Sequence, residues 1–295
     1  MTREMITRRD FLKQTGAAAL VATAGLPLTG RAERGAKAKV ILIRHQGVLD
    51  DAGVLDRKIL EQMLDEAMVA LTGSHTPGDA WNTLVTPTDI VGIKTNVWKY
   101  LRTPVELEEA MRTRLMAAGV QEGNIGIDDR GVLSNPVFSG ATALINTRPM
   151  RAHNWSGIGG CLKNYIMFSP SPPDYHSDSC IDLGALWNLP AVKGKTRLNV
   201  LVMLTPQFHC LGPHHFDEEY LWPYHGLLVG TDPVALDAVG LGIIEAKRRQ
   251  YFKDDSPMRP PVKHIRAAEE KHGIGVADLK RIEIVRMGWK DGALV

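Results

Sequence analysis

Histidines and a cysteine gather in the middle of the chain, where they could bind a metal ion. Six of the 10 histidines lie between residues 153 and 225, and the densest run is Gln-Phe-His-Cys-Leu-Gly-Pro-His-His at 207–215. Imidazole and thiolate groups are ligands of zinc, iron, nickel and copper. The spacing matches no standard metal motif, so the alternative is a loop whose histidines hydrogen-bond the backbone. The candidate metal ligands are His153, His176, His209, Cys210, His214 and His215.

A second set of residues is basic or polar and could bind an anion. Lys94 ends an apolar segment, and the glycine-rich run at 157–164 contains Lys163. Backbone N–H groups of such a turn can bind an anion, although this run is not a P-loop. We expect Lys94 and Lys163 to converge on a phosphate or carboxylate as catalytic groups; the alternative is that they are solvated surface lysines. The expected substrate-binding residues are Asn96, Arg148, Arg151 and Asn164.

Acidic residues supply a third set of candidates. Asp128 follows the apolar segment at 124–127 and is better placed for catalysis than Asp129, because it lies where the predicted strand ends. Asp232 precedes Pro233 and is most simply a helix cap. Asp237 lies on a different part of the same predicted helix, from which it could face the site. Asp128 and Asp237 are therefore the acidic candidates for catalysis.

The elements that must position these groups alternate between strands and helices, which predicts an α/β fold. We expect a layered, mostly parallel or mixed sheet with flanking helices and a long loop-rich middle region from 148 to 225. The Thr-Pro-Val-Glu run at 103–106 predicts a helix start capped by Thr103. The predicted strands cover 39–44, 89–96, 124–128, 142–146, 198–204 and 281–286. The predicted helices cover 56–71, 103–118, 232–252 and 262–272, and 73–82 is expected to be a loop.

The first thirty-five residues resemble a twin-arginine export signal. Arg8 and Arg9 are followed by Asp-Phe-Leu-Lys and a mildly apolar run from Ala17 to Leu28. That run is too short for a membrane span and contains glycine and proline, so we interpret it as a signal and not an anchor. An ordinary basic, amphipathic helix is the alternative. We expect cleavage at about residues 30–38, a periplasmic or secreted mature protein, and the twin-arginine translocation machinery as a partner.

Composition limits the remaining chain to a few classes of protein. The net charge is +2, and several positive charges belong to the leader, so nothing favours binding to nucleic acid or a membrane surface. No later segment is long and apolar enough to span a bilayer. An apolar fraction of 44% is ample for a core. We expect a single α/β domain over 39–295.

The three cysteines, Cys161, Cys180 and Cys210, leave at least one thiol without a disulfide partner. One disulfide with one buried free thiol is the first interpretation, and metal or cluster ligation is the second. Their wide spacing differs from the short Cys-x-x-Cys loops of ferredoxins. We therefore expect a transition metal (zinc, iron, nickel or copper) in preference to an iron–sulfur cluster.

Several motifs follow one another along the chain: Lys-Thr-Asn at 94–96, Ile-Asn-Thr-Arg-Pro-Met-Arg-Ala-His at 145–153, Gly-Gly-Cys-Leu-Lys-Asn at 159–164, His176, and Asp-Pro-Val-Ala-Leu-Asp-Ala at 232–238. In this order they resemble the family called domain of unknown function 362. Thr95 stands where the family pattern has proline, and Cys161 stands where a small residue is common. The resemblance implies an α/β protein, in a family with some members fused to ferredoxin modules and some exported by the twin-arginine route, but it implies no settled activity.

Three functions follow from these observations. The first is an exported, metal-dependent enzyme that acts on a small anionic substrate. The second is a redox or maturation accessory protein with a cysteine-linked cofactor or an iron–sulfur association. The third is a periplasmic anion-binding protein that performs no chemistry.

Overall fold

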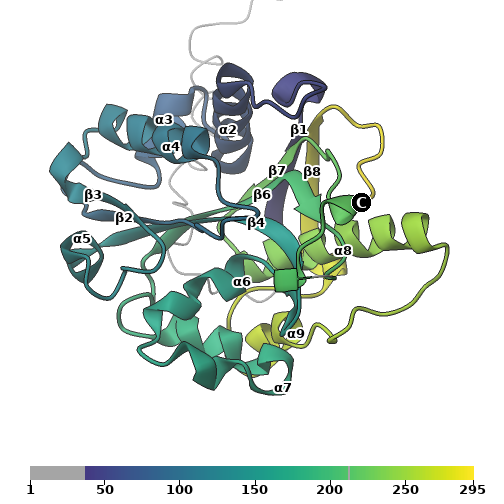
Figure 1. Cartoon of the computed structure of the whole chain (residues 1–295). Coiled ribbons are helices and arrows are strands. Elements are labelled where there is room, and N and C mark those ends of the chain that lie inside the picture. The colour runs from purple at the N-terminus through teal and green to yellow at the C-terminus, as the bar shows by residue number, and fades with distance from the viewer. Residues whose placement is uncertain (1–36, 212) are drawn as a thin grey trace, which may run out of the picture.

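A single eight-stranded sheet forms the centre of the molecule. The structure, a computed structural model, describes residues 37–211 and 213–295; the predicted export leader at 1–35 lies outside them. The strand order is β3-β2-β4-β6-β7-β1-β8, and β5 pairs only with β4 (Figure 1). The strands are β1 (Ala38–Arg44), β2 (Val91–Lys94), β3 (Ile125–Asp128), β4 (Ala143–His153), β5 (Gly157–Gly159), β6 (Thr196–Gln207), β7 (Gly226–Gly230) and β8 (Ile282–Gly288).

Most neighbouring strands run in the same direction. The pairs β2–β3, β2–β4, β4–β6 and β1–β8 are parallel, whereas β7 is antiparallel to both of its neighbours. The carboxyl ends of β2, β3, β4 and β6 therefore meet at one edge of the sheet, where open α/β sheets place their binding sites. The predicted mixed, mostly parallel α/β fold is confirmed.

Helices cover both faces of the sheet (Figure 1). One face packs against α2 (Arg57–Thr72), α3 (Pro77–Asn82) and α4 (Val105–Ala117) through one apolar cluster. A second apolar cluster covers the other face and includes α8 (Pro233–Phe252). The remaining helices are α5 (Pro136–Gly140), α6 (Cys161–Asn164), α7 (Ser177–Cys180) and α9 (His264–Glu270).

Local sequence signals explain where two long helices begin. The side chain of Asp56 accepts hydrogen bonds from the backbone N–H groups of Lys58 and Ile59 at the start of α2. Asp232 caps α8 in the same way, with Pro233 in its first turn. Both caps satisfy backbone donors that have no partner within the helix. The predicted cap at Asp232 is confirmed.

Three local expectations were wrong. Residues 77–82 form α3 and not a loop, because Thr76 caps a short helix that buries Trp81. Helix α4 begins at Val105, and the Thr103 hydroxyl contacts the backbone N–H of Asn96 instead of capping that helix. Strand β4 continues to His153, well past its predicted end at residue 146. No helix within the described residues is long and apolar enough to cross a membrane.

Candidate anion-binding site

A pocket of about 280 Å³ opens at the carboxyl edge of the parallel strands. Its wall combines residues that follow β2 and β3 with residues of β4, the β4–β5 turn and α6. The charged and polar lining residues are Asn96, Asp129, Arg130, Arg148, Arg151, His153, Lys163, Asn164 and His176, together with the indoles of Trp98 and Trp155.

Arg148 and Arg151 line the same pocket although they lie three residues apart on β4. Strict alternation places side chains at that spacing on opposite faces of a strand. The register of β4 against β6 shifts between Pro149 and Arg151: β4 advances two residues there, whereas β6 advances from Val202 to Gln207. The extra residues therefore belong to β6, and the regular pairing of the two strands is interrupted where the arginines reach the pocket.

The two guanidinium groups are buried, and their Nε atoms lack a hydrogen-bond acceptor in the part of the chain that the structure describes. Arg148 is 3% exposed and Arg151 is 8% exposed, and the Nε atom of each has no partner among the described residues. Arg151 instead lies over the Trp98 ring, with its Cζ 3.8 Å from the ring centroid. Burial lowers the pKa of both groups, and the Arg148 charge lowers the pKa of Arg151 further. Buried cations of this kind are costly unless an anion compensates them.

Helix α6 presents Lys163 to the pocket, and Asp237 holds the start of that helix. The Asp237 carboxylate accepts hydrogen bonds from the backbone N–H groups of Cys161 at 2.6 Å and Leu162 at 2.9 Å. Burial raises the pKa of Asp237 to about 7, although both backbone donors favour its charged form. Asp237 does not line the pocket, so its position fits an anchor for α6 and for Lys163.

Two adjacent glycines make room for these contacts. A Cβ atom at Gly160 would lie 2.1 Å from Oδ1 of Asp237, and one at Gly159 would lie 2.7 Å from Nη2 of Arg148. Both distances are far below any normal contact, so a larger residue would displace the carboxylate or the guanidinium. The glycine-rich run therefore accommodates two charged side chains, and it gives no sign of a phosphate-binding turn.

The Lys163 ammonium group has no carboxylate partner within residues 37–211 and 213–295. Its Nζ lies 3.5 Å from Sγ of Cys180 and 5.8 Å from the centroid of the Trp155 ring. Burial lowers the pKa of Lys163 to about 8, with a smaller contribution from the Arg148 charge. The pKa of the Cys180 thiol is raised by burial, so at neutral pH the lysine faces a neutral thiol.

Lys94 contrasts with Lys163 because it is fully paired. Its Nζ donates to Oδ1 of Asp129 and, at 2.7 Å, to the carbonyl of Thr95. Burial lowers the pKa of Lys94 to about 8 against the opposing effect of Asp129. Burial alone would raise the pKa of Asp129, but the Lys94 charge outweighs it and the net shift is downward. Of the two lysines predicted to converge on a phosphate or carboxylate, only Lys163 lines the pocket; Lys94 is absent from the lining and bonds to Asp129, which does line it.

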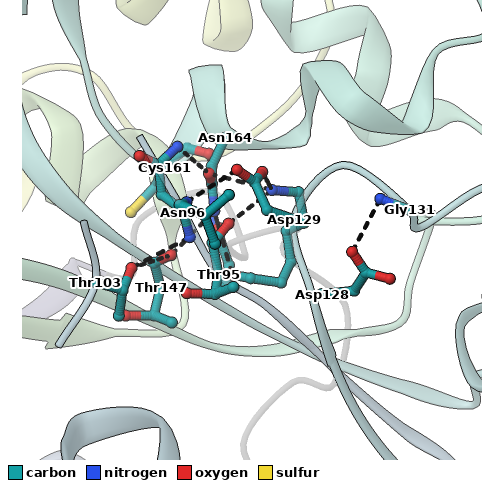
Figure 2. Close-up of polar contacts among 12 residues, drawn as sticks. Thr95, Asn96, Thr103, Asp128, Asp129, Gly131, Thr147, Cys161 and Asn164 are labelled. Carbon is teal, nitrogen blue, oxygen red and sulfur yellow. Dashed lines mark hydrogen bonds and ion pairs between the residues drawn. The ribbon is translucent and has the colours of Figure 1, made fainter. Parts of the chain in front are cut away.

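Asn164 links the strand ends to α6. Its Nδ2 donates to Oδ1 of Asn146 at 2.8 Å and to the carbonyl of Thr147 at 3.1 Å. Its Oδ1 lies 3.4 Å from the Asn96 amide nitrogen. Figure 2 shows the side chains of Asn96 and Asn164 close together beside Asp129. Asn96 and Asn164 line the pocket and also join its two halves; their role in substrate binding stays a prediction.

Asp128 points away from this group (Figure 2). It accepts hydrogen bonds from the Gly131 N–H at 2.9 Å and from Nδ2 of Asn135 at 3.1 Å. These contacts stabilise the turn that follows β3, and Asp128 is absent from the pocket lining. The structure places its neighbour Asp129 in the pocket instead.

The predicted metal ligands separate into two places. His153 and His176 line the pocket. The centroid of the Trp155 ring lies 6.0 Å from that of the His153 imidazole and 4.0 Å from that of the His176 imidazole. Burial and nearby cations lower the pKa of both histidines, to about 4 for His176. Both imidazoles are therefore neutral near pH 7.

The histidines of the 209–215 loop lie outside the pocket lining. Nδ1 of His209 is 3.0 Å from Nη1 of Arg248, and His214 stacks on Tyr100 with ring centroids 5.4 Å apart. Cys210 Sγ contacts the His215 carbonyl at 3.4 Å. Across residues 37–211 and 213–295, no three His, Cys, Asp or Glu side chains are grouped closely enough to hold a metal ion. The loop's position favours the alternative of backbone and packing contacts.

Sequence reasoning missed three of the residues that shape the pocket. Asp129 was ranked below Asp128, although an aspartate pair after a strand presents either residue to the site. Trp98 and Trp155 were passed over, although each lies near a predicted basic group in the sequence. The expected disulfide is also wrong, because all three cysteines are free.

The family comparison covers the elements that build this pocket. Residues 91–242 match the family described as domain of unknown function (DUF362), from the start of β2 into α8. The match spans more than half of the chain and includes Arg148, Arg151 and Lys163. No curated protein and no solved structure matches the chain. A chain with these strand-end motifs and this extent of match belongs to the DUF362 family.

Proposed function

We propose that the protein is an enzyme that acts on a small oxyanion held in this pocket. The observation that carries the proposal is the pair of buried guanidinium groups, Arg148 and Arg151, whose Nε atoms have no acceptor among the described residues. Guanidinium groups match the geometry of carboxylates and phosphates. A bound oxyanion would supply the missing acceptors and offset the charge.

The size and composition of the pocket support a small ligand. A volume of about 280 Å³ suits a molecule of a few carbon atoms with one or two anionic groups. Asp129, the carboxylate of the lining, is bonded to Lys94. The charges of Asp129 and Asp237 also act on Arg148, whereas Arg151 forms no ion pair with a carboxylate among the described residues. Lys163 is placed to bind or polarise the anion beside the arginines.

Calorimetric titration of the purified protein tests the anion proposal. The probes are inorganic phosphate and malonate in a buffer of weakly binding anions. We expect one site per chain, and we expect Arg151→Met to weaken binding roughly 100-fold, since loss of a buried charged partner costs about 2–5 kcal/mol. Arg266→Met removes an exposed arginine (80% exposed side chain) on α9 and should leave binding unchanged. Equal binding by both variants and the wild type would overturn the proposal.

A bound transition metal is a second candidate feature, favoured by the two neutral imidazoles of His153 and His176 on the pocket wall. In this version the metal would act as a Lewis acid toward the bound anion. Elemental analysis of protein matured through its own export route tests it. About one metal per chain that is lost in His176→Ala would support the metal, and metal-free protein that still binds malonate would remove it.

Export by the twin-arginine route is also part of the proposal, and it is based on Arg8, Arg9 and the apolar run that follows them. The measurement is the location of the mature chain after Arg8→Lys/Arg9→Lys substitution. We expect the wild type outside the cytoplasm and the variant within it. The same location for both chains would contradict this route.

A further inference from the structure

The Lys163 side chain combines three properties that set it apart from the other described lysines. It is 4% exposed, it lines the pocket, and no carboxylate of the described chain pairs with it. Its backbone belongs to a short helix whose first turn is fixed by Asp237. The amine is therefore held in place beside Arg148 and Arg151 and is unoccupied by an ion pair.

A lysine in such surroundings is suited to nucleophilic chemistry. Desolvation and neighbouring cations favour the neutral amine, which is the reactive form toward a carbonyl carbon. With a pKa of about 8, about a tenth of the lysine is neutral at pH 7 and about half at pH 8. Lys94 has a similarly lowered pKa, but its Nζ is engaged by Asp129 and by the Thr95 carbonyl.

We propose that Lys163 forms an imine with the carbonyl carbon of a small oxo acid whose carboxylate binds to Arg148 and Arg151. The inference rests on the proposed anion function and names its substrate class. A carboxylate on the arginines places the adjacent carbonyl within the same small pocket as the amine. The two guanidinium groups can bind the single negative charge of such a ligand, while the carbonyl carbon next to its carboxylate becomes part of a cationic iminium.

The step balances without a co-reactant. The Lys163 ammonium first loses one proton to solvent, which leaves the neutral amine. The amine nitrogen then attacks the carbonyl carbon, the carbonyl π bond opens, and one proton moves from nitrogen to oxygen to give a carbinolamine. A proton from solvent is added to the hydroxyl, the C–O bond breaks, and the C=N bond forms. One water leaves, and the resulting iminium keeps the positive charge of the original ammonium.

Borohydride trapping tests this step. The protein is incubated with pyruvate, or with 2-oxoglutarate, and reduced with sodium borohydride, and the adduct is located by peptide mass mapping. We expect one adduct per chain, at Lys163, that forms roughly tenfold faster at pH 9 than at pH 7, as the neutral fraction of an amine with this pKa does. Lys163→Arg should lose the adduct, and Lys193→Arg, a change on the loop before β6, should keep it.

Two controls separate the possible failures. Malonate, which has no reactive carbonyl, should suppress trapping by occupying the arginines, and thermal melting shows whether Lys163→Arg is folded. If malonate binds but no adduct forms at Lys163, the imine proposal is wrong and the proposed anion binding is unaffected. An adduct at Lys163 that malonate does not affect supports the imine and contradicts the arginine site. Labelling spread evenly over surface lysines in both the wild type and Lys163→Arg overturns the imine.

Discussion

Lys94 and Lys163 are two buried lysines at one pocket, and burial lowers the pKa of each to about 8. Lys94 lies against Asp129 and the Thr95 carbonyl, and it joins the end of β2 to the turn after β3. Among the described residues, the only hydrogen-bond partner of the Lys163 Nζ is the sulfur of Cys180. The comparison shows that burial alone does not distinguish a structural lysine from a functional one, whereas the presence of a partner does.

The arginines repeat the same contrast. Arg44 is as buried as Arg148, at 3% exposure, but its Nε donates to the Tyr224 carbonyl at 2.8 Å and its Nη1 to the Asp291 carbonyl at 2.6 Å. It also lies between the rings of Tyr224 and Trp289. The buried guanidinium of Arg44 is therefore satisfied by the fold. The Nε atoms of Arg148 and Arg151 lack a partner among the described residues, as do those of the half-buried Arg112 and Arg197, but only Arg148 and Arg151 are buried and line the pocket that we assign to an anion.

The largest expected effect comes from breaking the paired lysine. Lys94→Met leaves the Asp129 carboxylate buried without its cation, which should lower the free energy of unfolding by about 3–5 kcal/mol. Denaturant unfolding near pH 7 measures the change. If Lys94→Met were as stable as the wild type, the interpretation of Lys94 as a structural lysine would be wrong.

The matching change at the unpaired lysine should act in the opposite direction. Lys163→Met removes a buried cation that has no counterion, and a pKa lowered from 10.5 to about 8 corresponds to a gain of up to about 3 kcal/mol at pH 7. The gain should shrink as pH rises from 8 to 10.5, because the unfolded wild type then binds more protons than the folded one. The measurement is unfolding free energy against pH for both proteins, and a destabilised Lys163→Met would refute this interpretation.

A smaller effect is expected from crowding one arginine without removing it. The Cβ of Gly159→Ala would lie 2.7 Å from Nη2 of Arg148, so the guanidinium must move while its charge stays. We expect malonate affinity to fall about tenfold, or about 1.4 kcal/mol, as measured by calorimetric titration. Gly123→Ala, where a Cβ meets nothing within 4 Å, is the matched control. An unchanged affinity in Gly159→Ala would show that Arg148 does not contact the ligand.

The smallest effect concerns pH. Lys163 contributes its positive charge to anion binding below its pKa and loses it above, so malonate affinity should fall severalfold between pH 7 and pH 9. Lys163→Arg keeps its charge throughout this range and should show a flat profile. Titrations at both pH values provide the check, and identical slopes for the two proteins would remove Lys163 from the anion site.

The sequence predicted the layered sheet and several of the pocket residues, because apolar periodicity and strand-end polarity are local signals. Lys163, Arg148 and Arg151 were identified as basic groups near predicted strand ends. Their roles relative to Lys94 were not predictable, since pairing with Asp129 depends on the parallel register of β2 and β3. The extension of β4 past Pro149 was not predicted either, in this case because proline ordinarily argues against a central strand.

The metal prediction shows the limit of counting residue types. Histidines close in sequence at 209–215 lie outside the pocket lining, whereas His153 and His176, far apart in sequence, share one wall. The adjacent glycines 159 and 160 likewise gained a physical explanation only when the charged groups opposite them were visible. Contacts between distant segments decide both cases, and no local pattern encodes them.

One measurement tests the central claim most directly, namely that Arg148, Arg151 and Lys163 bind an anion in this pocket. The unfolding free energies of the wild type and Arg151→Met are compared without ligand and with low-millimolar malonate or phosphate. We predict a reversal of order: the variant is more stable without the anion, because it lacks a buried uncompensated charge, and the wild type is more stable with it. A wild type that is more stable than Arg151→Met under both conditions, by the same margin, would contradict the account.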